Sequence, residues 1–67
     1  MRKVVDEFPF GKYKMLILDG EVPFIRHNKY RIDGEYYDPV IVYDAKNCIA
    51  IISKDSFVGK TVYFEMV

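Results

Sequence analysis

The sequence predicts an all-β protein, a small antiparallel meander of five or six strands. Aromatic residues make up 16% of the 67 residues, with six Tyr and five Phe, and such side chains suit the half-buried, pleated surface of a strand. Asp-Gly pairs separate short apolar runs, which is the strongest short-range signal for a β-hairpin. No segment keeps the 3.6-residue apolar period over the length that a stable helix needs.

Length and composition favour one small folded domain over residues 1–67. Hydrophobic residues make up 51% and charged residues 30% of the chain, which excludes a disordered polar tail. Ten Lys+Arg balance ten Asp+Glu, so strong non-specific attraction to nucleic acid or an anionic membrane is not expected. The single cysteine, Cys48, excludes an internal disulfide framework and an all-cysteine metal site.

Turn residues divide the chain into short apolar runs. The expected strands are 13–18, 21–26, 29–32, 35–42, 48–53 and 61–67. Asp19-Gly20 and Asp33-Gly34 are expected to form type I′ turns, in which both central residues have positive φ. His27-Asn28 is a weaker third turn, because Asn tolerates the left-handed region.

Strands this short and this close together are expected to curl into a small barrel, because closure removes exposed edges. The long loop at 53–60 before the last strand resembles the layout of small SH3-like barrels. That resemblance implies closure into an SH3-like barrel with a 3₁₀ turn in the loop. The ALYDY-type and Trp-containing ligand motifs of SH3 domains are absent, and the chain has no Trp.

Pairing through these turns sorts the side chains onto two faces, because successive residues of a strand alternate. The face expected to form the core carries Leu16, Leu18, Pro23, Ile25, Tyr30, Ile32 and Tyr37. The second face has an apolar end made of Met15, Ile17, Val22 and Phe24. Its polar end consists of Arg26, Lys29, Arg31, Tyr36 and Asp38.

The apolar end of the second face is too hydrophobic to be left in water. Two interpretations remain open. In the first, the cover lies within the chain: the N-terminal segment, with Val4, Val5, Phe8 and Phe10, folds across these residues, or the barrel closes over them. In the second, a partner protein or a second copy covers them. In the last strand, Val62, Phe64 and Met66 are expected to point inward, and both faces of 48–53 are apolar.

No constellation of residues points to catalysis, a metal or a cofactor. Gly59-Lys60-Thr61 resembles the end of a phosphate-binding loop, but Lys54 stands where that loop needs a glycine. His27 and Cys48 are single and far apart, which disfavours a zinc site or a nucleophile–base pair. The acidic residues Asp33, Glu35, Asp38 and Asp44 lack the ligand order of a calcium loop.

The expected function is therefore that of a non-catalytic β module, protein-binding or regulatory, whose partner is another protein or a second copy of itself. The expected partner-binding residues are Met15, Ile17, Val22, Phe24, Arg31 and Tyr36. The alternative is a single-stranded nucleic-acid-binding domain that uses Arg26, Lys29, Arg31 and Tyr36. A cytoplasmic location without membrane attachment is expected, since Asp6 and Glu7 interrupt any signal-like N-terminal stretch.

Overall fold

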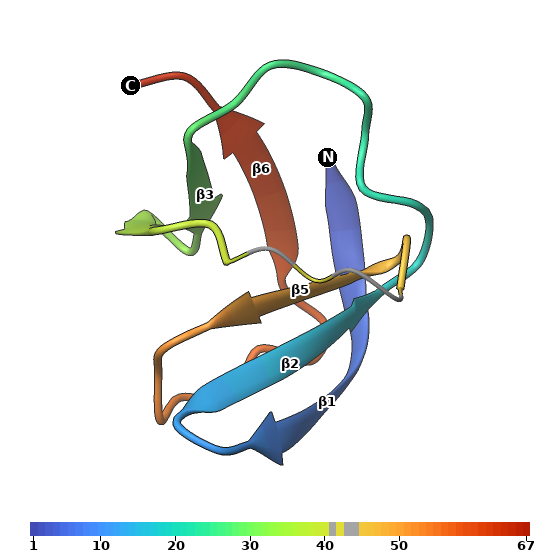
Figure 1. Cartoon of the computed structure of the whole chain (residues 1–67), viewed down its shortest axis with the longest axis vertical. Helices are drawn as coiled ribbons and strands as arrows, with labels where there is room; N and C mark the ends of the chain where they lie inside the picture. Colours follow the sequence, from blue (N-terminus) through green and yellow to red (C-terminus); the bar gives the residue numbers. More distant parts are fainter. Residues whose placement is uncertain (41, 43–44) are drawn as a thin grey trace.

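The computed structural model describes residues 1–40, 42 and 45–67. Over these residues the chain is a small all-β domain whose six strands form one antiparallel sheet in the order β4-β3-β6-β1-β2-β5 (Figure 1). The strands are β1 (Arg2–Phe10), β2 (Tyr13–Leu18), β3 (Lys29–Ile32), β4 (Glu35–Tyr37), β5 (Cys48–Ile51) and β6 (Thr61–Glu65). The all-β, antiparallel prediction is confirmed. No helix in the described part of the chain is long and apolar enough to span a membrane.

The prediction of a simple meander is wrong, because β2 does not pair with the segment that follows it. β2 lies between β1 and β5, and β6 lies between β1 and β3. Asp19-Gly20 is the cause: neither residue has positive φ. Instead, the Asp19 N–H donates to the Lys3 carbonyl oxygen at 2.9 Å, so the chain stays beside β1. The expected strand at 21–26 and its pairings therefore do not form.

Gly20 allows a close approach of the Arg2 side chain rather than a turn. A Cβ atom at this position would lie 3.0 Å from Nε of Arg2, inside van der Waals contact. Arg2 uses the same Nε to donate to the carbonyl oxygen of Glu21 at 2.7 Å. The Asp-Gly pair thus has a tertiary role here that its sequence does not reveal.

The N-terminal segment is the longest strand of the sheet. β1 turns into β2 through Gly11-Lys12, with Gly11 at φ 61°, which fits a type II′ hairpin turn. Arg2 and Lys3 pair with β6, and the register with β2 shifts between Val4 and Asp6. This β-bulge at Val5 bends β1, so that one strand serves both halves of the sheet.

The Asp33-Gly34 turn is confirmed. Its φ angles are 54° and 83°, as a type I′ turn requires, and it pairs Tyr30 with Tyr37 and Arg31 with Tyr36. The predicted turn at His27-Asn28 is wrong. There the side-chain amide of Asn28 pairs with the backbone of Val67, donating to its carbonyl oxygen at 3.0 Å and accepting its N–H at 2.9 Å.

Gly34→Ala is expected to lower the free energy of unfolding by about 1–2 kcal/mol, because a Cβ atom disfavours the left-handed region. Space does not limit the substitution, since no atom lies within 4 Å of a Cβ built there. Urea denaturation measures the loss. Asp33→Asn is the matched control, because Asn tolerates positive φ. Equal urea midpoints for Gly34→Ala and the parent protein would contradict the turn geometry.

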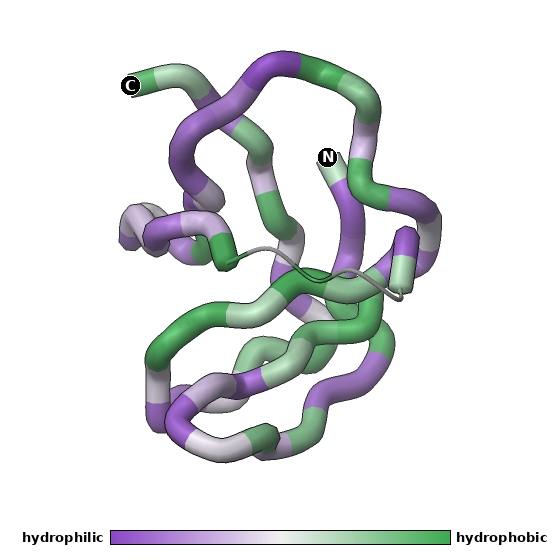
Figure 2. Tube along the Cα trace, viewed as in Figure 1, coloured by the Kyte–Doolittle hydropathy of each residue, from purple (hydrophilic) through white to green (hydrophobic). Residues whose placement is uncertain are grey.

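The core lies between the inner faces of the two halves of the bent sheet. Its buried members are Val4, Leu16, Leu18, Tyr30, Ile32, Ile49, Ile51, Phe57, Val62 and Phe64. The predicted core positions Leu16, Leu18, Tyr30 and Ile32 are confirmed, and Tyr37 packs against them. Figure 2 shows the apolar run along β5, where both faces are buried. The sequence predicts a central strand here, and that part is wrong, because β5 stands at one end of the strand order.

Other predicted core positions are wrong because their segments are not strands. Ile25 is 54% exposed and Met66 is 58% exposed. Pro23 is half-buried and outside the core cluster. Phe57, by contrast, is buried although it belongs to the loop between β5 and β6. The sequence had predicted only a long connection there.

Glu7 holds this loop against β1 and β2. Its Oε1 accepts the Phe57 N–H at 2.6 Å, and Nζ of Lys14 lies 3.2 Å from its Oε2. The backbone hydrogen bond from Phe57, followed by the ammonium of Lys14, lowers the pKa of Glu7 below its ordinary value even though partial burial opposes this. Nζ of Lys14 also donates to the Asp55 carbonyl oxygen at 2.5 Å.

Glu7→Gln is expected to lower the free energy of unfolding at about pH 7 by about 1 kcal/mol. This value is at the low end for a hydrogen bond to a charged group, because Glu7 is partly exposed. Because the folded pKa of Glu7 is lowered, its contribution is complete above the unfolded pKa and disappears as pH falls through the folded pKa. The difference between the variant and the parent should therefore shrink below about pH 4. Urea denaturation over a pH series measures it, with exposed Glu35→Gln as the control.

Candidate functional site

The outer face of β1, β2 and β5 is apolar. Because Leu16 points into the core, its neighbours Met15 and Ile17 point outward. Met15 lies opposite Phe8 on β1 and opposite Ala50 on β5, and residues paired in this way share a face. The aromatic rings of the N-terminal segment therefore lie beside Met15 and Ile17 instead of covering them, and they widen the apolar face.

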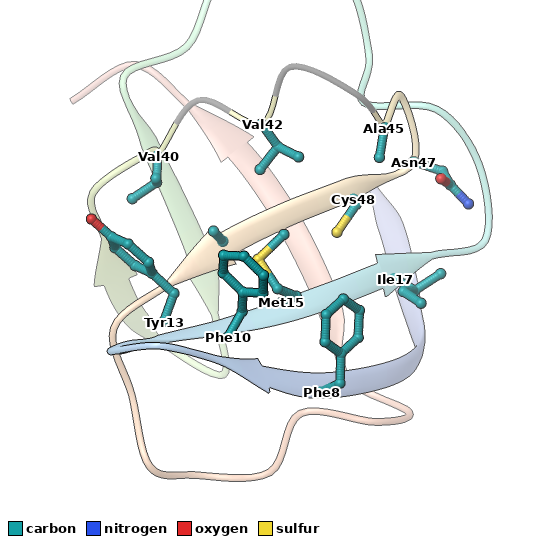
Figure 3. A pocket seen from close by; sticks show the side chains of 11 residues that line it. Phe8, Phe10, Tyr13, Met15, Ile17, Val40, Val42, Ala45, Asn47 and Cys48 are labelled. Carbon is teal, nitrogen blue, oxygen red and sulfur yellow. The ribbon is translucent and has the colours of Figure 1, made fainter.

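The segment after β4 forms a second wall along this face. Val40 makes an isolated bridge to Ala50 of β5, and Val42 and Ala45 follow it along the rim (Figure 3). The predicted strand 35–42 ends at Tyr37 among the described residues. Its residue 41, and the acidic residue Asp44, lie outside the described residues.

Phe8 and Phe10 of β1 form one wall, and Val40, Val42 and Ala45 form the other (Figure 3). The hollow between them has a volume of about 570 Å³ and is called the apolar trough below. It is lined by Phe8, Phe10, Tyr13, Met15, Ile17, Val40, Val42, Ala45, Asn47, Cys48 and Ala50. None of these side chains carries a charge. The side chains of Tyr13 and Asn47 lie at opposite ends (Figure 3). A hollow of this size and lining is typical of binding sites for apolar groups.

The described hydrogen bonds show how the chain returns from the second wall to the sheet. The Asn47 carbonyl oxygen accepts the N–H of Leu18 at 2.8 Å, and the Lys46 carbonyl oxygen accepts the N–H of Val22 at 2.7 Å. These bonds fix Asn47 beside the end of β2. One end of the trough therefore lies next to Ile17 and Asn47 (Figure 3).

Cys48 lies in the floor of the apolar trough and is a free thiol with 7% of its surface exposed. Burial raises the pKa of the Cys48 thiol. Because the thiolate is the reactive form, a raised pKa and a buried sulfur both disfavour nucleophilic chemistry. The arrangement fits an apolar lining residue.

Alkylation of Cys48 at about pH 8 is expected to be at least about 100-fold slower in the folded protein than in urea, because burial removes both thiolate and access. Mass spectrometry of time points with a neutral thiol reagent measures both rates. A cysteine peptide sampled in both solutions corrects for the effect of urea on the reagent. Folded and unfolded rates within threefold of one another would contradict the burial of this thiol.

The predicted partner-binding residues fall into three separate places. Met15 and Ile17 line the apolar trough. Val22 and Phe24 belong to the loop at 19–28, where Phe24 is fully exposed at 109% and Val22 packs against the core. Arg31 and Tyr36 lie opposite each other on β3 and β4.

The sequence prediction missed the walls of the trough. Phe8 and Phe10 were expected in a covering segment, and Cys48 and Ala50 were assigned only to an apolar strand. One signal was available: Gly11-Lys12 separates two alternating apolar runs, as a Gly-X hairpin does. The pairing of β5 with β2 had no such local signal.

The cations of the predicted nucleic-acid site are largely engaged within the chain. Nε of Arg31 lies 2.6 Å from Oε2 of Glu65, and its guanidinium lies over the Tyr63 ring at 4.5 Å. Lys29 forms an ion pair with Asp38. Arg26 is exposed in the 19–28 loop. Nucleic-acid binding stays a prediction, and no geometry of these side chains favours it.

His27 has a packing role. Its ring lies 5.1 Å from the Phe64 ring and 5.8 Å from the Tyr30 ring, and its Nδ1 is 2.8 Å from the Ile25 carbonyl oxygen. In residues 1–40, 42 and 45–67, no three His, Cys, Asp or Glu side chains gather in a way that could hold a metal ion.

Comparison of the chain with protein-family models, with curated proteins and with solved structures finds no match.

Proposed function

We propose that the protein is a non-catalytic binding module, acting in the cytoplasm, that takes an apolar segment of a protein partner into the apolar trough. The observation that carries the proposal is the trough itself, about 570 Å³, whose lining among the described residues is uncharged. Phe8 and Phe10 on its wall are 42% and 66% exposed. Aromatic side chains are the commonest energetic anchors of protein interfaces.

We further propose that the sheet closes into a small SH3-like barrel. The two ends of the strand order are β4 and β5, and the bridge between Val40 and Ala50 joins the chain just after β4 to β5. The bulge at Val5 supplies the bend that a small barrel needs. Such closure would leave the trough as an outer groove along the wall of the barrel.

Selection from a phage-displayed random peptide library tests the binding function. We expect enrichment of peptides with aromatic and aliphatic residues, followed by binding of a synthetic copy that fluorescence anisotropy can measure. Phe10→Ser is expected to weaken this binding at least tenfold, because it removes an exposed aromatic anchor. Val58→Ser is the matched control, since Val58 is 52% exposed and does not line the trough.

Two results would overturn the proposal. One is a library selection that enriches no sequence. The other is a selected peptide whose affinity is the same for the parent protein and for Phe10→Ser. Amide chemical-shift changes measured by NMR should also centre on β1, β2 and β5, and changes centred on β3 and β4 would move the site elsewhere.

A further inference from the structure

The loop at 19–28 has an exposed apolar tip, which consists of Phe24 and Ile25. Phe24 is 109% exposed and Ile25 is 54% exposed, and the cation Arg26 follows them. In Figure 1 this loop arches from the end of β2 to β3 on the side of the molecule away from the β1–β2 hairpin. Figure 2 shows its apolar stretch next to a hydrophilic one. Burial of an exposed Phe side chain is favourable, so this tip is suited to insertion.

The base of the loop is anchored at both ends. On one side, the Glu21 carbonyl oxygen accepts from Arg2 at 2.7 Å and the Val22 N–H donates to Lys46 at 2.7 Å. On the other side, the Asn28 N–H donates to the Glu65 carbonyl oxygen at 2.9 Å. A tip carried on fixed ends loses less conformational entropy on insertion than a free segment would.

The tip and the apolar trough are complementary surfaces on the same molecule, and Phe24 does not line the trough of its own chain. The described lining residues of the trough, Phe8, Met15 and Val40 among them, offer Phe24 apolar contacts. Asp6 pairs with the trough residue Ile17 and so lies on the same face of the sheet, just beyond Phe8. Its exposed carboxylate complements Arg26, two residues after Phe24. Each surface thus carries an apolar part with a charge near it, and the two charges are of opposite sign.

We propose that the partner of the apolar trough is a second copy of this chain, whose Phe24 tip inserts into the trough with Arg26 beside Asp6. This inference rests on the proposed binding function of the trough. The tip and the trough are different patches, so the contact is heterologous, and one contact leaves a tip and a trough free for further copies. Self-association should therefore rise with concentration beyond a dimer or close into a ring.

Two variants separate the tip from the trough. Phe24→Ser removes the tip at a fully exposed position, and Phe10→Asp places a carboxylate at the trough wall, where the native ring is 66% exposed. In light scattering at concentrations up to about 1 mM, each variant alone is expected to stay at the monomer mass of 7.9 kDa. Mixed together, the intact trough of one variant should take the intact tip of the other, and the mass should double and stop there.

Exchange of the two charges tests whether Arg26 of one copy lies beside Asp6 of the other. Arg26→Asp alone and Asp6→Arg alone should each weaken self-association at least tenfold, and the protein carrying both should recover most of the loss. Circular dichroism checks that every variant is folded.

Several results would overturn the inference. They are a parent protein that stays monomeric up to about 1 mM, association unchanged by Phe24→Ser, and a variant mixture that does not form a dimer. A small apolar molecule that native mass spectrometry finds in the trough would also overturn it. If the chain is monomeric but selected peptides still bind the trough, only self-association fails and the binding function stands.

Discussion

Leu16→Asp is expected to leave the chain unfolded at room temperature, whereas Phe24→Asp is expected to leave it folded. The side chain of Leu16 is 0% exposed and that of Phe24 is 109% exposed. Loss of a buried Leu costs about 2–5 kcal/mol, and a buried carboxylate without a partner adds several more. At the usual stability per residue, a domain of 67 residues has only about 3–10 kcal/mol to lose.

Far-ultraviolet circular dichroism and the dispersion of amide NMR signals distinguish the two outcomes. Leu16→Ala serves as a milder variant whose stability can still be measured, with an expected loss of about 2–5 kcal/mol. Unfolding by Phe24→Asp would mean that this ring belongs to the core. It would also remove the tip on which the inference about self-association depends.

The contrast between Leu16 and Phe24 shows what the sequence alone could predict. Turn residues delimited the segments 13–18, 29–32 and 61–67, and strands form at 13–18, 29–32 and 61–65. Side-chain alternation then assigned Leu16, Leu18, Tyr30 and Ile32 to the inner face, because one side of each strand packs on the core. The segment 21–26 has a similar apolar content but no strand partner. Pairing is decided by tertiary contacts, which an apolar pattern does not contain.

The two Asp-Gly pairs also show that a local sequence pattern does not by itself determine the structure that forms. Asp33-Gly34 takes two positive φ angles and turns the chain, whereas Asp19-Gly20 takes none. The local preference is the same in both pairs. What differs is the neighbour: Lys3 bonds to Asp19, and Arg2 packs against Gly20. Those partners lie about fifteen residues or more away in the chain, too far for a turn rule to include.

The residues that line the trough could be predicted only in part, because their positions also depend on contacts between distant strands. Met15 and Ile17 were assigned to the second face because they alternate with Leu16 and Leu18, although the hairpin through Asp19-Gly20 used in that prediction does not form. The walls depend on β1 and β5, which join β2 on its two edges. Because antiparallel register depends on both strands, the sequence of one strand cannot say whether Phe8 lies over Met15 or beside it.

Phe57→Ala is expected to lower the free energy of unfolding by about 3–5 kcal/mol, the loss typical of a buried Phe. Phe57 is 2% exposed, although it lies in the loop between β5 and β6. Its ring packs edge-on against Tyr37 at 5.7 Å, and its N–H donates to Glu7. One residue of this loop therefore joins β4 to the β1–β2 hairpin.

The neighbouring residue provides the matched control, because Val58 is 52% exposed. Val58→Ala should change the free energy of unfolding by no more than about 0.5 kcal/mol, as surface substitutions usually do. Urea denaturation measures both variants, and Phe57→Leu, which leaves a smaller cavity and should lose less stability than Phe57→Ala, covers the case in which Phe57→Ala does not fold. Equal losses for Phe57→Ala and Val58→Ala would mean that the loop does not close the core.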